Sequence, residues 1–144
     1  MEESSFFEVE KLIRFQHCDP AGIVFYPQYF VLFHELIEDW FGKGLGVDYG
    51  SFISSQRLGI PTVHLECNFA APSKIGDVLT FRLAVRKLGS TSIALSLSAC
   101  DKDQVRVHVN QTVVLLSLES RQPQPISADL RSRMSSFLVA EQTA

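Results

Sequence analysis

The sequence predicts an α+β fold in which an antiparallel sheet of about five strands curls around one long buried helix. Apolar residues recur at helical spacing over residues 27–41, and from residue 61 onward the apolar period changes to two. A helix that is apolar around most of its circumference needs cover on nearly all sides. A curled sheet accounts for both patterns, because its concave face can bury the helix.

The helix over 27–41 has the strongest pattern in the chain. Pro27 suits its first turn, where the missing N–H of proline is no loss. The wide apolar stripe consists of Tyr29, Phe30, Phe33, Leu36, Ile37, Trp40 and Phe41. The narrow polar face consists of Gln28, Glu35, Glu38 and Asp39. We therefore expect a mostly buried helix with one solvated edge.

Strands are predicted over 78–85 and 92–99, where apolar and polar residues alternate. The short turns at 88–90 and before Val105 imply antiparallel pairing. The strand that begins at Val105 loses its alternation at Gln111, which a bulge or a change of environment would explain.

The other segments are predicted from weaker patterns. Residues 8–15 form a first strand of mixed alternation, and the glycine-rich stretch 42–50 forms a loop. A short helix is expected near 51–57. A polar linker with two prolines then leads to a last short helix, which Ser127 caps and which ends near Val139.

The composition is that of a soluble globular protein, and we expect residues 1–144 to form a single domain. The net charge of −3 disfavours a nucleic-acid binder. The three cysteines are odd in number, far apart and without C-x-x-C spacing, so they indicate neither a zinc knuckle nor a disulfide framework and fit a reducing cytoplasm. No signal peptide is evident, and no apolar run approaches the ~18 residues that span a bilayer. We expect neither a cofactor nor a membrane partner.

Asp19 is the clearest candidate for a catalytic group. As part of an Asp-Pro-Ala-Gly run it is also a plausible turn former, and spacing alone favours that interpretation. An apolar stretch follows the turn, however, and then a helix starts near Tyr26 and Pro27. Unpaired backbone N–H groups at a helix start carry partial positive charge, which stabilises a developing oxyanion. The backbone N–H of Tyr26 is therefore the expected oxyanion donor.

The other polar candidates are weaker. His17 could orient Asp19, bind substrate or cap the strand end, and we expect a supporting role. His17 and Asp19 alternate like metal ligands, but no third ligand lies nearby, so no metal site is expected. Glu66 is expected to be structural, for example as a partner of Arg82, although a place in a pocket stays open. His34 and His64 are expected to be structural, and His108 to lie on an exposed strand face.

The segment over residues 19–29 (DPAGIVFYPQY) resembles the active-site segment of the 4-hydroxybenzoyl-CoA thioesterase family. The resemblance extends over roughly residues 9–118. Further similar segments are 59–63, 69–72, 76–80 and the turn 88–92.

This resemblance implies a hotdog fold and hydrolysis of a CoA thioester, an aryl-CoA such as 4-hydroxybenzoyl-CoA in the prototype, without metal or cofactor. It assigns Asp19 as nucleophile or as general base, and it assigns carbonyl polarisation to the backbone N–H of Tyr26. It also implies a homo-oligomer, either a dimer or a dimer of dimers (a homotetramer), with each site completed across an interface. Substrate contacts are expected at Gly22, Phe25, Pro27, Arg86, Lys87 and Ser90.

Two departures from the family pattern leave the acyl group open. His17 stands where the prototype has an acidic residue, and the turn at 89–91 is Gly-Ser-Thr where the prototype is basic. One alternative is a thioesterase for short aliphatic acyl groups. Another is a protein that binds an acyl-CoA or an acyl-carrier protein without cleaving it. A third is a hotdog dehydratase or hydratase, which the pair His17 and Asp19 superficially allows.

Overall fold

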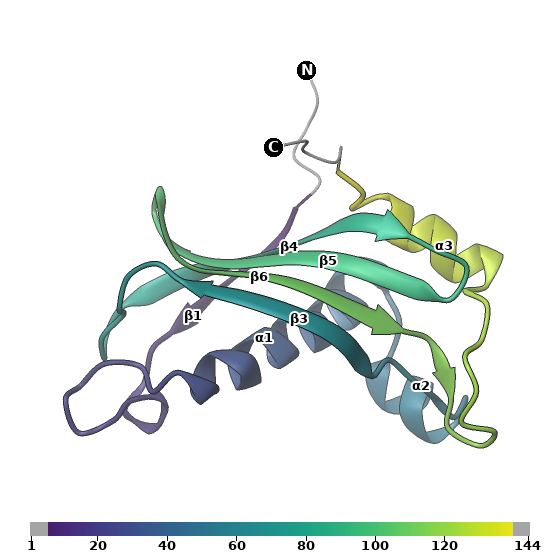
Figure 1. Ribbon diagram of the computed structural model, residues 1–144, viewed down its shortest axis with the longest axis horizontal. Coiled ribbons are helices and arrows are strands. Elements are labelled where there is room, and N and C mark those ends of the chain that lie inside the picture. Colours follow the sequence, from purple (N-terminus) through teal and green to yellow (C-terminus); the bar gives the residue numbers. More distant parts are fainter. Residues whose placement is uncertain (1–5, 140–144) are drawn as a thin grey trace.

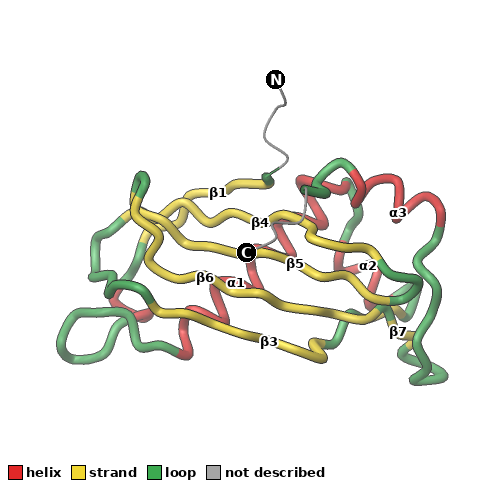
Figure 2. The backbone as a smooth tube through the Cα atoms, turned by 45° about the horizontal axis from the view of Figure 1, so that its top comes forward, coloured by secondary structure: helices red, strands yellow, loops and turns green. Residues whose placement is uncertain are grey.

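The computed structural model describes residues 6–139, in which a curved five-stranded sheet arches over one long helix (Figure 1). The strand order is β1-β4-β5-β6-β3, and every neighbouring pair is antiparallel. The strands are β1 (Phe7–Leu12), β3 (Thr62–Phe69), β4 (Val78–Leu88), β5 (Ser92–Asp101) and β6 (Gln104–Val114). β1 and β3 therefore form the two edges of the sheet (Figure 2).

Helix α1 (Pro27–Asp39) lies along the concave face of the sheet (Figure 1). Every second residue of the central strands points toward it and is buried. Contact is direct at the middle of the helix, where the Phe33 and Phe81 rings lie 5.3 Å apart. The inward residues of β4 and β5 are Leu79, Phe81, Leu83, Val85, Ile93, Leu95, Leu97 and Ala99. The hotdog fold expected from the sequence is confirmed.

The helix extends beyond its predicted end. Residues Trp40–Leu45 continue α1 as a π-helical segment, where a loop was expected from 42 onward. Trp40, Phe41 and Leu45 are all buried, so packing overrides the low helix propensity of the glycines between them. The segment ends at Gly46, whose φ of 71° is the left-handed conformation that glycine adopts without strain.

The sheet also departs from the expected boundaries. β1 ends at Leu12, because a 3₁₀ turn at Phe15–His17 follows it. Gln111 causes no bulge in β6, since it occupies the next inward position in register. The register shifts at three other places, where Val63 of β3, Arg86 of β4 and Arg106 of β6 are extra residues.

The remaining elements are short. Helix α2 (Tyr49–Ser54) starts earlier than expected, and a two-residue pair, β2 (Leu58–Gly59) with β7 (Leu116–Ser117), was not predicted. Helix α3 (Ala128–Ser135) is capped by Ser127, as predicted, but it ends before the expected Val139. Within residues 6–139, no helix is long and apolar enough to cross a membrane.

The π-helical segment offers a matched test of packing. A Cβ at Gly44 would lie 2.7 Å from the Trp40 ring and 3.3 Å from the rings of Phe7 and Phe137, whereas a Cβ at Gly42 meets nothing within 4 Å. We expect Gly44→Ala to lower the free energy of unfolding by about 1–3 kcal/mol through overpacking. Gly42→Ala should be neutral or stabilising by up to about 1 kcal/mol. Urea denaturation gives the free energy of unfolding of both variants. An equal change in Gly44→Ala and Gly42→Ala would contradict the prediction.

Candidate functional site

Asp19 lies at the tip of a short hairpin, residues 17–25, which we call the Asp19 hairpin. Cys18 and Val24 bridge its two arms, and the Phe25 N–H donates to the His17 carbonyl oxygen at 2.9 Å. The Asp19 Oδ1 atom accepts a hydrogen bond from the Ala21 N–H at 2.9 Å. Its second oxygen has no hydrogen-bond partner among the described residues. The carboxylate is thus held as a turn former while one oxygen stays available.

The start of α1 leaves one backbone donor unpaired. Pro27 has no N–H, and the N–H groups of Gln28 and Tyr29 donate to the carbonyl oxygens of Phe25 and Tyr26 at 2.8 and 3.1 Å. Within residues 6–139, the Tyr26 N–H has no such acceptor. Its partial positive charge at the helix start is therefore directed at solvent or a ligand.

Tyr26 also lines a mostly apolar cavity of about 300 Å³, which we call the Tyr26 cavity. The Phe69 ring forms part of its wall, with its centroid 6.1 Å from the ring centroids of both Tyr26 and Tyr29. The complete lining is Val24, Tyr26, Tyr29, Phe69, Ala70, Ala71 and Pro72. The cavity thus lies between the start of α1 and the end of edge strand β3.

Two backbone hydrogen bonds join the Asp19 hairpin to residues 72–77, the segment that leads into β4. The Val24 N–H donates to the Ser73 carbonyl oxygen at 2.9 Å, and the Ile75 N–H donates to the Gly22 carbonyl oxygen at 3.0 Å. The position of Asp19 therefore depends on where residues 72–77 are held.

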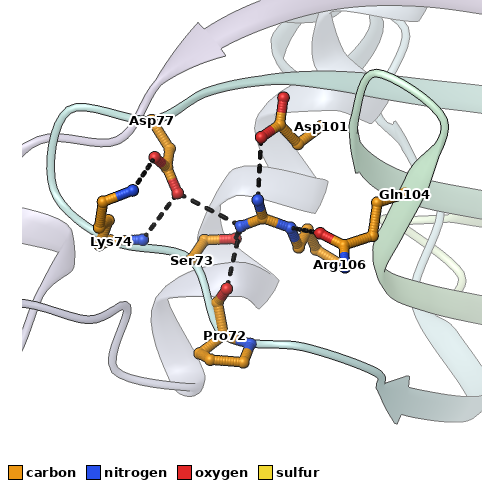
Figure 3. A network of polar contacts seen from close by, with 7 residues as sticks. All are labelled: Pro72, Ser73, Lys74, Asp77, Asp101, Gln104 and Arg106. Atoms are coloured by element: carbon orange, nitrogen blue, oxygen red, sulfur yellow. Dashed lines mark hydrogen bonds and ion pairs between the residues drawn. The ribbon is translucent and has the colours of Figure 1, made fainter.

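Arg106, on β6, holds residues 72–77 in place (Figure 3). Its Nη1 atom donates to the Pro72 carbonyl oxygen and to Ser73 Oγ, both at 2.9 Å, and lies 3.3 Å from Asp77 Oδ2. Its Nη2 atom donates to Asp101 Oδ2 at 2.9 Å, at the end of β5. A planar guanidinium can satisfy all these acceptors at once, which an ammonium cannot.

The surroundings shift the pKa values of Asp77 and Tyr29 in opposite directions. The backbone N–H of Lys74, with the side chains of Lys74 and Arg106, lowers the pKa of Asp77. Burial raises the pKa of the Tyr29 phenol. The Tyr29 hydroxyl is buried beside Ser73 but makes no well-formed hydrogen bond with a described residue.

His17 lies apart from the Tyr26 cavity. Its ring is 7% exposed, and Nδ1 accepts a hydrogen bond from the Arg14 N–H at 2.9 Å. Burial lowers the pKa of His17, so the neutral ring with its proton on Nε2 is favoured. The ring lines a separate cavity of about 240 Å³ with Lys11, Leu12, Arg14, Gln16, Leu32 and Glu35. His17 thus stabilises the turn before the hairpin, and a catalytic supporting role stays a prediction.

Two further observations concern a thiol nucleophile and a metal site near Asp19. Burial, and next the charge of Asp19, raise the pKa of the Cys18 thiol, which disfavours a thiolate nucleophile. No cluster of three or more His, Cys, Asp or Glu side chains that could hold a metal ion occurs in the described part of the chain.

The expected CoA-binding residues lie far from Asp19 within one chain. Arg86, Lys87 and Ser90 belong to the end of β4 and the turn into β5, which lies at the right of Figure 1 beside α3. The segment that precedes α1 lies at the left, at the opposite end of the sheet. Gly22, Phe25 and Pro27, by contrast, lie within the Asp19 hairpin or directly after it.

The partner suggested for Glu66 and the exposed position expected for His108 are both wrong. Glu66 does not pair with Arg82, since Arg82 pairs with Glu8 at 2.7 Å and Glu66 lies 3.4 Å from His64 on the exposed side of β3. His108 is partly buried instead of exposed, with Nε2 3.2 Å from Ser96 Oγ.

The polar edge of α1 is likewise not simply solvated. Lys11 of β1 reaches it and pairs with Glu35 at 3.5 Å and with Asp39 at 3.1 Å.

Sequence reasoning missed Ser73, Asp77 and Arg106 as the residues that position the hairpin. The Gly-Asp pair before β4 was noticed only as part of the segment 76–80, which resembles the family, and a lone arginine near a strand start carries no periodic signal. These three residues come together only because the start of β6 and the segment before β4 lie at the same end of the sheet. The spacing of residues along the sequence does not show this.

Comparisons with known proteins identify the family. The profile of the Thioesterase-like superfamily matches residues 13–134. A 1,4-dihydroxy-2-naphthoyl-CoA hydrolase from Acaryochloris marina is 29% identical over 124 residues, which is 83% of this chain and 89% of that protein. A corresponding hydrolase from Synechococcus elongatus is 29% identical over 127 residues, covering 87% of this chain and 92% of its own length.

Solved structures show the same fold. A gentisyl-coenzyme A thioesterase superposes with a TM-score of 0.78 at 25% identity, covering 90% of this chain and 98% of that one. A thioesterase-superfamily protein from Jannaschia sp. CCS1 superposes with a TM-score of 0.86 at 22% identity, covering 97% and 99% of the two chains.

The lowered pKa of Asp77 predicts a specific acid sensitivity. Its contribution to stability is complete above the unfolded-state pKa of 3.8 and disappears as the pH falls through the lower folded-state value. We expect Asp77→Asn to be less stable than the wild type at neutral pH and to lose less stability between pH 5 and pH 3. Asp103→Asn, in an exposed turn, serves as control. The free energy of unfolding is measured in urea from pH 5 to pH 3. If Asp77→Asn loses as much stability over this range as the wild type, the account is wrong.

Proposed function

The chain belongs to the Thioesterase-like superfamily and is a thioester hydrolase, and we propose that its substrate is the CoA ester of an aromatic acid. The observation that carries the proposal is that Tyr26, which directly follows the hairpin that bears Asp19, lines an apolar cavity and has an N–H without an acceptor within residues 6–139. A carbonyl oxygen in this cavity could accept that hydrogen bond. The thioester carbonyl would then face the Tyr26 N–H, and the acyl group would face the apolar wall of the cavity.

Catalysis in this proposal needs only the protein's own groups and water. The Tyr26 N–H and the partial charge of the helix start stabilise the oxyanion that develops on the carbonyl oxygen. The Asp19 carboxylate acts in one of two ways. It attacks the carbonyl carbon, expels the CoA thiolate and forms an anhydride that water then cleaves, or it takes a proton from a water molecule that attacks directly. Both routes consume one water and release a free acid and CoA thiol.

The aromatic acyl group is favoured by the cavity and by the relatives. Tyr26, Tyr29 and Phe69 contribute rings to the cavity wall, where a flat ring could stack or pack edge-on. The similar proteins named above act on 1,4-dihydroxy-2-naphthoyl-CoA and gentisyl-CoA, which both carry hydroxylated aromatic acyl groups. 4-Hydroxybenzoyl-CoA remains a candidate of the same class.

We also propose that the working enzyme is a homo-oligomer. Arg86, Lys87 and Ser90 can contact a CoA bound near Asp19 only if they come from another copy, because they lie at the opposite end of the sheet in one chain. Edge strand β3 supports this, since Val63, Leu65 and Phe69 are 61%, 39% and 50% exposed. An unpaired apolar edge strand is a ready site for pairing with a second copy.

Asp19→Asn tests the catalytic assignment. Asn retains the Oδ1 acceptor for the Ala21 N–H but can neither attack a carbonyl nor take a proton. We expect kcat for aryl-CoA hydrolysis, measured by thiol release, to fall by about 10²–10⁴-fold with little change in unfolding. The matched control is Asp48→Asn, because Asp48 also accepts a backbone N–H, at the start of α2. Wild-type turnover in Asp19→Asn would refute the assignment.

A further inference from the structure

His17 is a buried histidine whose hydrogen bond to the backbone depends on its protonation state. It is only 7% exposed, and its Nδ1 atom accepts a hydrogen bond from the Arg14 N–H at 2.9 Å. An acceptor at Nδ1 requires a neutral ring with its proton on Nε2. In a protonated ring both nitrogens carry a proton, so the Arg14 N–H would lose its acceptor and face a second donor. The contact therefore exists only while the ring is neutral.

This contact lies at the base of the Asp19 hairpin. The His17 N–H donates to the Arg14 carbonyl oxygen at 2.9 Å, so the ring and the backbone of His17 both bind the same residue. The His17 carbonyl oxygen accepts the Phe25 N–H, which closes the hairpin. Asp19 follows two residues later, within a chain distance of at most about 7 Å. A change in the turn at 14–17 is therefore passed directly to the hairpin arm that carries Asp19.

Charged groups face the His17 ring from the elements packed against it. Lys11 of β1, Arg14 of the turn and Glu35 of α1 line the same cavity of about 240 Å³. Glu35 is already paired with Lys11 at 3.5 Å, and the neighbouring Cys18 thiol is neutral near pH 7 because burial raises its pKa. Burial lowers the pKa of His17, Glu35 opposes this shift, and Arg14 and Lys11 add to it. A proton on the ring is therefore disfavoured while the hairpin is closed.

We propose that His17 is a positioning residue for Asp19. Its neutral ring holds the Asp19 hairpin, and protonation of the ring releases the Arg14 amide, loosens the hairpin and lowers turnover in mild acid. The effect on turnover rests on the proposed function, to which this inference adds a residue and a pH limit.

The direction of the pH dependence follows from the two states of the hairpin. When the hairpin opens, the His17 ring returns to its ordinary pKa of 6.5. Below pH 6.5 the open form therefore binds a proton more readily than the closed form. Opening is then favoured by up to about tenfold for each pH unit, until the closed form is protonated as well. Above pH 6.5 the ring is neutral in both forms and has no such effect.

Amide hydrogen exchange tests the hairpin directly. Exchange is measured by NMR from pH 7.5 to pH 5.5 and corrected for the intrinsic pH dependence of the rate. In the wild type we expect the protection of the Arg14 and Phe25 amides to fall by up to about tenfold at pH 5.5, while amides in the centre of β5 stay protected. The loss should begin near pH 6.5 and level off where the ring, followed by its ¹⁵N chemical shifts, is fully protonated. Constant protection over this range would overturn the inference.

His17→Asn removes the titration but keeps the acceptor. Oδ1 of asparagine, like Nδ1 of histidine, is the third atom beyond Cα and can accept the Arg14 N–H throughout this pH range. We expect its protection to be independent of pH. The matched control is His34→Gln, because the His34 ring is exposed on α1, and it should retain the wild-type pH dependence. If His17→Asn does not fold, the wild type alone decides, since its loss of protection must follow the protonation of the His17 ring.

The effect on catalysis is read from kcat and KM for an aryl-CoA ester, from pH 7.5 down to a pH at which the His17 ring is protonated. Protonation of the ring should lower kcat of the wild type by about tenfold or more, because the Asp19 carboxylate moves out of position. KM should change less. His17→Asn should keep its kcat where the wild type loses it. Equal kcat profiles of the two proteins would overturn the inference even if their exchange rates differed.

The two measurements separate this inference from the proposed function. If the wild type hydrolyses no CoA ester, the proposed function fails, and the exchange rates still decide whether the neutral ring holds the hairpin. If the wild type hydrolyses the ester but His17→Asn shows the same pH dependence of exchange and turnover, this inference fails alone.

Discussion

The position of the candidate site depends on the contacts of one guanidinium group. Arg106 joins the start of β6 to the end of β5 through Asp101 and to residues 72–77 through Pro72, Ser73 and Asp77. Its side chain is 12% exposed, so these charge-assisted contacts are only weakly screened. Residues 72–77 in turn hold the Asp19 hairpin through backbone hydrogen bonds. A strand residue remote in sequence therefore determines where the carboxylate lies.

The proposed thioester hydrolysis depends on how α1 and the Asp19 hairpin are held in place. The buried stripe of α1 fixes the helix against the sheet. Tyr26 lies at the helix start, where no preceding turn offers an acceptor, and its N–H has none within residues 6–139. The hairpin that Arg106 fixes indirectly ends at that donor. The Tyr26 cavity lies beside the end of edge strand β3, and its wall combines the exposed rings of Tyr26 and Phe69 with the buried ring of Tyr29. The hairpin that carries Asp19, the Tyr26 N–H and the Tyr26 cavity are thus all at the start of α1.

The fold was largely predictable, because hydrophobic periodicity is a local property. The helix stripe from Tyr29 to Phe41 and the alternating strands indicated the core before any contact was known. Asp19 and Tyr26 stood out because they are adjacent to a turn and a helix start. Arg106 and Asp77 did not, since their roles depend on strand pairing across long sequence separations. Gln111 was taken as a lapse in a pattern, although the sheet keeps it in register and buries it.

The most direct test of the central role of Arg106 is amide hydrogen exchange in Arg106→Lys. Lysine keeps the charge but lacks the planar fork that contacts Pro72, Ser73 and Asp101 together. The account predicts that the Val24 and Ile75 amides, which bond to residues 73 and 22, exchange about tenfold faster or more, while amides in the centre of β5 keep wild-type rates. Unchanged exchange at Val24 and Ile75 would show that the Asp19 hairpin does not depend on Arg106.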